Sequence, residues 1–211
     1  MITKEFVEAC IEKAENGLPA YIPPVSGFSS DKVRRLLNNL CSKAGTFYLE
    51  IGVHNGSTFI PALYRRSRVV ATCIDNWSPH PVITENKRST FEDNIEKYLG
   101  KDRKINIIEH DMFTVDLALI PHKINVYFFD GPHDFPAQYQ AFVHYNPIFA
   151  DRFIAIVDDY NWLEPRDGTQ KAFKDLGYQI VFERVLPGDY NGSDKNWWNG
   201  LYVAIVDKKG K

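Results

Sequence analysis

The strongest constraint on the fold is a repeated alternation of short apolar segments with segments of helical spacing. The apolar segments are rich in β-branched and aromatic residues and cover residues 46–53, 69–75, 105–111, 124–130 and 153–159. Most of them have apolar residues at consecutive positions, which is typical of strands covered by helices on both faces. The alternation therefore predicts an α/β fold built on a mostly parallel sheet.

Two further strands are predicted near the end of the chain, over residues 178–186 and 201–206. Only the segment 187–200 separates them, so we expect an antiparallel C-terminal hairpin that completes a seven-stranded sheet. Helical spacing and capping residues predict helices over residues 3–15, 31–41, 57–65, 89–99, 136–149 and 169–176. We expect these helices to cover both faces of the sheet.

The length of 211 residues suits one globular unit, with a helical extension at 1–44 and a main domain at 45–211. The net charge of −2 gives no electrostatic footprint for nucleic acid or for an anionic membrane. No apolar stretch approaches the ~18 residues of a membrane span, and no signal peptide is recognisable. We therefore expect a cytoplasmic protein, whose N-terminal helices serve either as a lid or as the interface of a homo-oligomer.

Acidic residues recur at the C-terminal ends of the predicted strands. They are Asp75, Asp111, Asp130 and the pair Asp158–Asp159. Open parallel sheets bind their ligands in the crevice beyond the carboxyl ends of the strands. A single aspartate there can simply cap a turn, but five in register favour a functional site.

The first predicted strand runs into a glycine-containing turn, Glu50-Ile51-Gly52-Val53-His54-Asn55-Gly56-Ser57-Thr58. Gly52 and Gly56 allow a sharp turn into a helix and a close approach of the backbone to a ligand. The dinucleotide fingerprint GxGxxG requires a glycine where this chain has His54. The turn therefore favours an uncharged or zwitterionic ligand over a pyrophosphate.

Together these motifs resemble those of class I S-adenosylmethionine-dependent methyltransferases. The resemblance is carried by Glu50-x-Gly52-x-x-x-Gly56, by Asp75 and by Asp111, and it covers about residues 45–206. The segments 73–77, 129–133 and 157–160 resemble more narrowly the metal-dependent O-methyltransferases. That subgroup includes the macrocin and mycinamicin sugar O-methyltransferases and the cephalosporin hydroxylase-like proteins.

The resemblance implies a Rossmann-like methyltransferase sheet with S-adenosylmethionine as the cofactor. Gly52 and Gly56 would line its methionine end, Asp75 would accept hydrogen bonds from both ribose hydroxyls, and Asp111 would lie near the adenine. Glu50 would organise the glycine turn. The full set of cofactor residues implied in this way is Glu50, Gly52, Asn55, Gly56, Ser57, Thr58, Asp75, Asn76, Trp77, Asp111, Met112 and Asp130.

A metal site and a base are also expected at the same edge. Asp130, Asp158 and Asp159 can converge on Mg²⁺, which prefers oxygen ligands, although Asp158 or Asp159 could instead only cap a turn. His133 lies three residues beyond Asp130, and in the related enzymes the residue at this offset is the base. An imidazole suits that role near neutral pH; the alternative is a turn histidine that donates to the backbone.

These observations predict Mg²⁺-assisted methyl transfer to a hydroxyl of a small molecule or sugar, with His133 as general base. Aromatic residues in the loops after the strands suit stacking on a sugar or an aromatic ring. One alternative is a nicotinamide-dependent oxidoreductase, which would have an uninterrupted parallel sheet. Another is a catalytically silent protein that binds S-adenosylmethionine.

Overall fold

The computed structural model describes residues 2–78, 87–101, 103, 105–189 and 196–208 and contains one seven-stranded sheet. Its strands are β1 (Phe47–Ile51), β2 (Val70–Asp75), β3 (Ile105–Glu109), β4 (Ile124–Phe129), β5 (Phe149–Val157), β6 (Gln179–Leu186) and β7 (Leu201–Asp207). They lie in the order β3-β2-β1-β4-β5-β7-β6, and β7 is antiparallel to both of its neighbours. The predicted fold class is confirmed.

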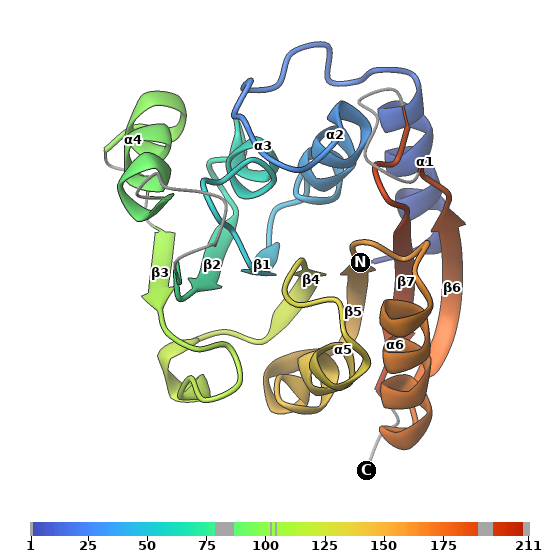
Figure 1. Ribbon diagram of the computed structural model, residues 1–211. Helices are drawn as coiled ribbons and strands as arrows, with labels where there is room; N and C mark the ends of the chain where they lie inside the picture. Colours follow the sequence, from blue (N-terminus) through green and yellow to red (C-terminus); the bar gives the residue numbers. More distant parts are fainter. Residues whose placement is uncertain (1, 79–86, 102, 104, 190–195, 209–211) are drawn as a thin grey trace.

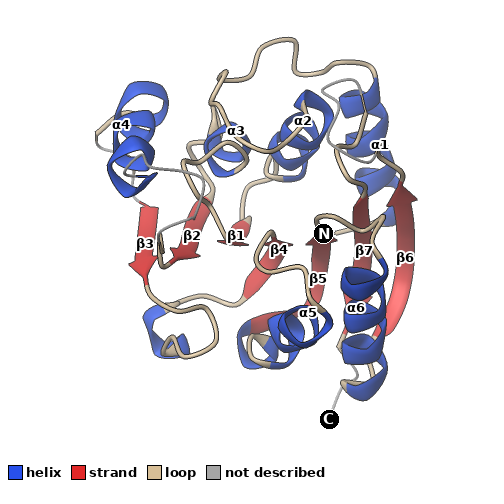
Figure 2. Cartoon of the chain, in the orientation of Figure 1, coloured by secondary structure: helices blue, strands red, loops and turns tan. Residues whose placement is uncertain are grey.

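Helices cover both faces of this sheet (Figure 1). They are α1 (Lys4–Glu15), α2 (Asp31–Leu40), α3 (Phe59–Leu63), α4 (Lys87–Leu99), α5 (Phe135–Val143) and α6 (Leu163–Asp175), with short 3₁₀ helices at Leu117–Leu119 and Asn146–Ile148. Helices α1 to α4 lie on one face, and α5 and α6 lie on the other (Figure 2). No helix in the described part of the chain has the length and apolar character needed to cross a bilayer.

The sheet separates two hydrophobic cores, as the alternation along β4 shows. Val126 and Phe128 pack into the core on the side of α1 to α4, whereas Tyr127 and Phe129 pack into the core on the side of α5 and α6. Successive side chains of a strand point to opposite faces, so a strand covered on both faces is apolar at every position. This double burial explains the continuous apolar runs of the sequence.

The two N-terminal helices belong to the first of these cores. Val7 of α1 and Leu36 of α2 are fully buried in the same cluster as Tyr48 of β1. The Ser30 side chain caps α2 by accepting from the Val33 backbone N–H at 3.3 Å. The domain boundary at residue 44 stays a prediction, but the extension shares its core with the sheet.

Two predicted helices differ by six residues at one end, and the other four differ by one or two residues at an end. The segment predicted as helix 136–149 ends at Val143, and β5 begins at Phe149, because Pro147 has no N–H and disfavours helix at the residue before it. Helix α6 begins six residues earlier than predicted, at Leu163. Pro165 is tolerated in its first turn, and Gly168 lies where a Cβ atom would be 2.8 Å from Gln138 Cβ.

Gly52 lets the end of β1 lie against the end of β4. Its φ is +82°, and a Cβ atom there would lie 2.0 Å from the carbonyl oxygen of Asp130. Gly56 also has a positive φ, of +88°. The glycine turn is therefore confirmed, and at Gly52 the close approach is to the chain's own backbone.

This contact predicts that Gly52→Ala destabilises the protein far more than Gly45→Ala. Gly45 has a similar φ of +79°, but a Cβ atom there would have no neighbour within 4 Å. The substitution Gly45→Ala therefore measures only the cost of a left-handed backbone at a non-glycine residue, about 1–2 kcal/mol. Gly52→Ala adds the displacement of the Asp130 backbone. Urea unfolding of both variants measures the difference, and equal losses would contradict this role of Gly52.

Candidate active site

A cavity of about 740 Å³ lies at the carboxyl ends of the central strands. Ligand pockets for small molecules commonly have volumes of ~300–1,000 Å³. The predicted site residues that line it are Gly52, Ser57, Thr58, Asp75, Asp130, His133, Asp158 and Asp159. The structure thus brings the glycine turn, the aspartates of β2, β4 and β5, and the predicted base to one cavity.

Other predicted site residues are not among those that line this cavity. They are Glu50, Asn55, Gly56, Asn76, Trp77, Asp111 and Met112. Asn55 is buried and donates to Ser26 Oγ at 3.4 Å, whereas Asn76 is exposed and accepts from the Ser78 backbone N–H at 3.0 Å. The loops after the strands, at 76–88, 131–135, 160–168 and 187–200, are predicted to form the pocket walls, and the segments 79–86 and 190–195 of these loops fall outside the described residues.

Asp75 is held by two backbone donors. Its Oδ2 accepts from the His54 N–H at 2.8 Å, and its Oδ1 accepts from the Trp77 N–H at 2.7 Å. The Trp77 indole N–H in turn donates to the His54 carbonyl at 2.7 Å. Each carboxylate oxygen has a second lone-pair direction, so Asp75 can still accept two hydroxyl groups of a ligand.

Strained backbone is concentrated at this site. Five described non-glycine residues have positive φ, and four of them, His54, Trp77, Asp159 and Trp198, lie in or beside the cavity. Such conformations cost free energy and persist where the surrounding contacts fix them, commonly at functional sites. At His54 and Trp77 the contact that fixes the backbone is the carboxylate of Asp75.

Glu50 supports the glycine turn from inside the protein. Its side chain is fully buried; Oε1 accepts from the Thr58 hydroxyl at 2.5 Å, and Oε2 accepts from the Tyr48 hydroxyl. Burial raises the pKa of Glu50 to about 8, and the hydrogen bonds from Thr58 and Tyr48 only partly oppose this. Glu50 therefore links the end of β1 to the start of α3.

Asp111 and Met112 lie farther along the same edge. Asp111 is exposed, and its Oδ1 accepts from the Phe113 N–H at 2.9 Å and from the Thr114 hydroxyl at 3.3 Å. The Met112 carbonyl accepts from the Tyr145 hydroxyl at 2.5 Å. These contacts stabilise the turn after β3, and the predicted contacts of both residues with adenine stay predictions.

His133 forms a pair with Asp159. The two atoms Nε2 of His133 and Oδ2 of Asp159 lie 3.1 Å apart, and the Asp159 side chain is only 7% exposed. Burial lowers the pKa of His133, and the nearby carboxylate of Asp159 only partly offsets this. An Nε2–H that donates to Asp159 leaves the lone pair of Nδ1 as the proton acceptor.

Asp130 and Asp158 form a second pair, in which the two carboxyl groups are hydrogen-bonded to each other. Burial raises the pKa of both, and the negative charge of Asp159 raises the pKa of each further. Two buried carboxyl groups in contact hold one proton between them more readily than two negative charges. Asp158 Oδ1 has no hydrogen-bond partner among the described residues.

The predicted metal site is not assembled in this arrangement. Among the described residues, no group of three or more His, Cys, Asp and Glu side chains is placed to hold a metal ion. Three carboxylates beside one cavity have suitable donor chemistry for Mg²⁺. Here, however, Asp130 and Asp158 bind each other and Asp159 binds His133. The magnesium site therefore stays a prediction.

Phe28 is a cavity residue that the sequence did not identify as part of the site. It belongs to the segment between α1 and α2, it is 64% exposed, and its ring lies 6.0 Å from that of His54. Gly27 lets this segment lie against the glycine turn, since a Cβ atom there would be 2.4 Å from Ser57 Oγ. An aromatic residue after a glycine in a linker was the one signal available.

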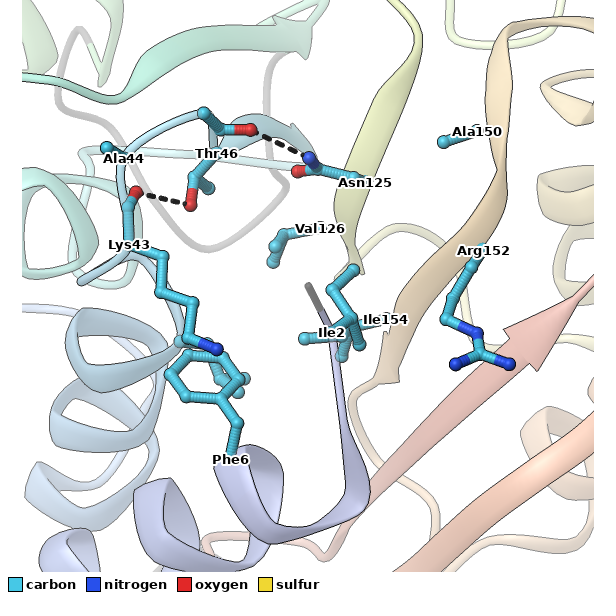
Figure 3. A pocket seen from close by; sticks show the side chains of 12 residues that line it. Ile2, Phe6, Lys43, Ala44, Thr46, Asn125, Val126, Ala150, Arg152 and Ile154 are labelled. Carbon is cyan, nitrogen blue, oxygen red and sulfur yellow. Dashed lines mark hydrogen bonds between the residues drawn. The ribbon is translucent and has the colours of Figure 1, made fainter.

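A second cavity, of about 310 Å³, lies at the opposite ends of the strands (Figure 3). Ile2 and Phe6 of the N-terminal segment line it together with Asn125 and Arg152. The ammonium of Lys43 lies 3.9 Å from the centre of the Phe6 ring. None of the predicted cofactor residues lines this cavity, so the motifs of the sequence converge on the first cavity.

No protein-family model and no curated protein matches the sequence. Solved structures match the fold. TYW2 from M. jannaschii in complex with AdoMet has 14% identity and a TM-score of 0.61, over 88% of this chain and 78% of that chain. A Staphylococcus aureus protein provisionally assigned as a caffeoyl-CoA O-methyltransferase has 17% identity and a TM-score of 0.61, over 94% and 91%.

A third similar structure is that of PH1948 from Pyrococcus horikoshii, provisionally assigned as an RNA methyltransferase. It has 13% identity and a TM-score of 0.55, and the match covers 99% of each chain. The fold is that of S-adenosylmethionine-dependent methyltransferases. At these identities the likeness extends to the fold, and the narrower sugar O-methyltransferase resemblance stays a prediction.

The buried position of Glu50 predicts a pH-dependent contribution to stability that Glu50→Gln removes. The unfolded chain releases this proton above about pH 4.5, whereas the folded protein keeps it up to about pH 8. The free energy of unfolding of the wild type should therefore fall relative to that of Glu50→Gln as the pH rises from 4.5 to about 8.

Urea unfolding at several pH values measures this difference. Asp151→Asn, which changes an exposed carboxylate, is the control and should follow the wild type. Parallel curves for the wild type and Glu50→Gln would contradict the assignment of a buried, protonated Glu50.

Proposed function

We propose that this protein transfers a methyl group from S-adenosylmethionine to a hydroxyl oxygen of a small molecule, with His133 accepting the proton. The observation that carries the proposal is the His133–Asp159 pair, at 3.1 Å, in the same cavity as the glycine turn and Asp75. The antiparallel β7 does not fit the uninterrupted parallel sheet expected of the alternative oxidoreductase.

The residues around Gly52 and Asp75 suit the methyl donor. Asp75 offers two fixed acceptor oxygens for the ribose hydroxyls, and Gly52, Ser57 and Thr58 line the adjoining part of the cavity. The sulfonium of the bound donor is positively charged, and the negative charge of nearby aspartates stabilises it. TYW2, with a similar fold, is known in complex with AdoMet.

Bound S-adenosylmethionine supplies an activated methyl group: the new O–CH₃ bond forms as the S–CH₃ bond breaks, which leaves S-adenosylhomocysteine. The chain has to orient the hydroxyl in line with that bond and remove its proton. Asp159 fixes the imidazole ring of His133 and favours the tautomer with the proton on Nε2. The proton of the hydroxyl then passes to Nδ1, and the low pKa of His133 keeps this atom unprotonated at neutral pH.

Magnesium assistance remains a separate part of the proposal. A divalent cation bound at Asp130 and Asp158 would lower the pKa of the substrate hydroxyl and orient it. The unpartnered Oδ1 of Asp158 and the hydrogen-bonded carboxyl pair are compatible with such a cation replacing their shared proton. The steps derived above for His133 and Asp159 do not depend on it.

Calorimetry with S-adenosylmethionine tests the donor site. We expect one binding site in the wild type and no binding of NAD. Asp75→Asn should weaken binding ~10-fold or more, because an amide nitrogen replaces one of the acceptor oxygens. Glu109→Gln changes the residue paired with Asp75 on the neighbouring strand and should bind normally. Binding of NAD in place of S-adenosylmethionine would refute the proposal.

Methyl-labelled S-adenosylmethionine with a panel of hydroxylated small molecules tests the base. His133→Ala should lower the turnover of the best acceptor ~100-fold or more and leave the affinity for the donor unchanged. In the wild type, turnover should rise with pH along a limb whose midpoint lies below the usual histidine pKa of 6.5.

His122→Ala is the control, since His122 contacts Phe47 at the opposite end of β1. Unchanged turnover in His133→Ala would remove this residue from the mechanism. Donor binding without transfer to any acceptor would favour the catalytically silent alternative.

A further inference from the structure

The cavity of the proposed reaction is strongly acidic. Its described lining includes Asp75, Asp130, Asp158 and Asp159, and no lysine or arginine is among these lining residues. A carboxylate or phosphate on the acceptor would meet like charges there, which costs free energy unless a cation compensates. A positively charged acceptor would gain from the same field.

Two oxygen atoms beside the cavity have no hydrogen-bond donor among the described residues. They are Oδ1 of Asp158, whose residue is 3% exposed, and Oδ1 of Asn199, and both residues line the cavity. Carboxylate and amide oxygens only accept hydrogen bonds, and leaving them buried without a donor is unfavourable. The ligand of this cavity is therefore expected to present hydrogen-bond donors to them, and the acidic lining favours donors that carry a positive charge.

The position of these oxygens assigns them to the acceptor rather than to the methyl donor. Asp75 ends β2, and Asp158 follows β5, which is separated from β2 by β1 and β4. Three strand spacings of ~4.8 Å place the two strand ends ~14 Å apart. The sulfonium is joined to the ribose through a single carbon, and the methionine end of the donor, which has its own ammonium, is expected at the glycine turn after β1. The Asp158 end, two strands farther along the sheet, is therefore left for the acceptor.

We propose that the acceptor carries a protonated amine near the hydroxyl that is methylated, and that Asp158 and Asn199 hold this amine. The inference rests on the proposed methyl transfer to a hydroxyl, and it is an alternative to magnesium at Asp158, because both would use the same oxygen. An ammonium group has three N–H donors, which suit the two unpartnered oxygens and one further acceptor. Trp162 and Trp198 line the same end of the cavity, and indole rings attract cations. An amino sugar or a hydroxylated amine has this chemistry.

The proposed acceptor of this protein is positively charged, unlike the acceptors named for two of its structural neighbours. Caffeoyl-CoA and RNA, the acceptors in the names of the S. aureus and P. horikoshii proteins, both carry phosphate groups. The described lining offers no lysine or arginine to receive a phosphate.

Binding of three matched sugars tests the inference. Glucosamine, glucose and glucuronate differ in one amine or carboxylate and serve as cationic, neutral and anionic probes. They are titrated by NMR into the full-length protein saturated with S-adenosylhomocysteine, in the presence of EDTA. We expect glucosamine to bind ~10-fold or more tightly than glucose, because charged hydrogen bonds replace neutral ones, and glucuronate to bind most weakly.

Two variants assign the preference to the named oxygens. Asn199→Ala and Asp158→Asn should each reduce the glucosamine preference, and Asp158→Asn should reduce it more because it also replaces one of the two carboxyl groups that share a negative charge. Asn196→Ala is the control, since Asn196 bonds to Asp189 at 2.7 Å and does not line the cavity. The control should keep the preference of the wild type.

Equal binding of the three sugars, or a preference that survives both variants, would overturn the inference while leaving the methyl-transfer proposal intact. A titration with Mg²⁺ alone is the second arm. If Mg²⁺ displaces glucosamine and strengthens glucose binding, the oxygens serve a metal ion and the inference is overturned. Failure of S-adenosylhomocysteine itself to bind would overturn the proposed function, and the amine inference with it.

Discussion

The site depends on one row of backbone hydrogen bonds that continues past the ends of four parallel strands. The Gly52 N–H donates to Ile74, the Asp130 N–H to Ile51, and the Asp158 N–H to Phe129, at 2.9, 2.9 and 3.2 Å. Each bond ties the first residue after one strand to the neighbouring strand. Because parallel strands run in register here, the residues that follow them are held at one edge. The acidic row is therefore a consequence of sheet geometry, and Gly52 makes it possible by leaving room for the Asp130 carbonyl.

Burial gives these acids different roles. Glu50 is fully buried, which raises its pKa to about 8 although its hydrogen bonds with Thr58 and Tyr48 oppose this, and it links β1 to α3. Asp75 accepts two backbone N–H groups and keeps further lone pairs for the donors of a ligand. Asp159 lies beside His133, where it favours the imidazole tautomer with the proton on Nε2. Acidic side chains at similar places in the sheet thus differ in chemistry because different groups donate hydrogen bonds to them.

The sequence predicted the parallel strands from their apolar runs. β1, β2, β4 and β5 lie inside the sheet, and β3, an edge strand with a single buried residue, was predicted in the same way. The acidic positions followed from the ends of these runs, and the C-terminal hairpin followed from the short connection before β7. The start of α6 was missed because Pro165 and Gly168 normally oppose a helix, whereas here one lies in the first turn and the other packs on Gln138. Phe28 was missed because its place in the site depends on a contact between segments far apart in the chain. Pairings such as His133 with Asp159 depend on a backbone of positive φ, which the spacing of residues does not encode.

Substrate specificity depends on the residues that line the cavity, because the fold itself is shared with other proteins. Proteins at 13–17% identity share this sheet, although the names of two of them point to acceptors as different as a thioester of coenzyme A and RNA. In the proposed function, the strand order fixes where the nucleoside of the donor lies, because Asp75 and the glycine turn belong to adjacent strands. The proposed acceptor end is formed instead by Asp158, by Trp162 before α6, and by Trp198 and Asn199 before β7. Only Asp158 among these is held by the strand-end hydrogen bonds, so the loops can change the charge and shape of the acceptor site without disturbing the donor site.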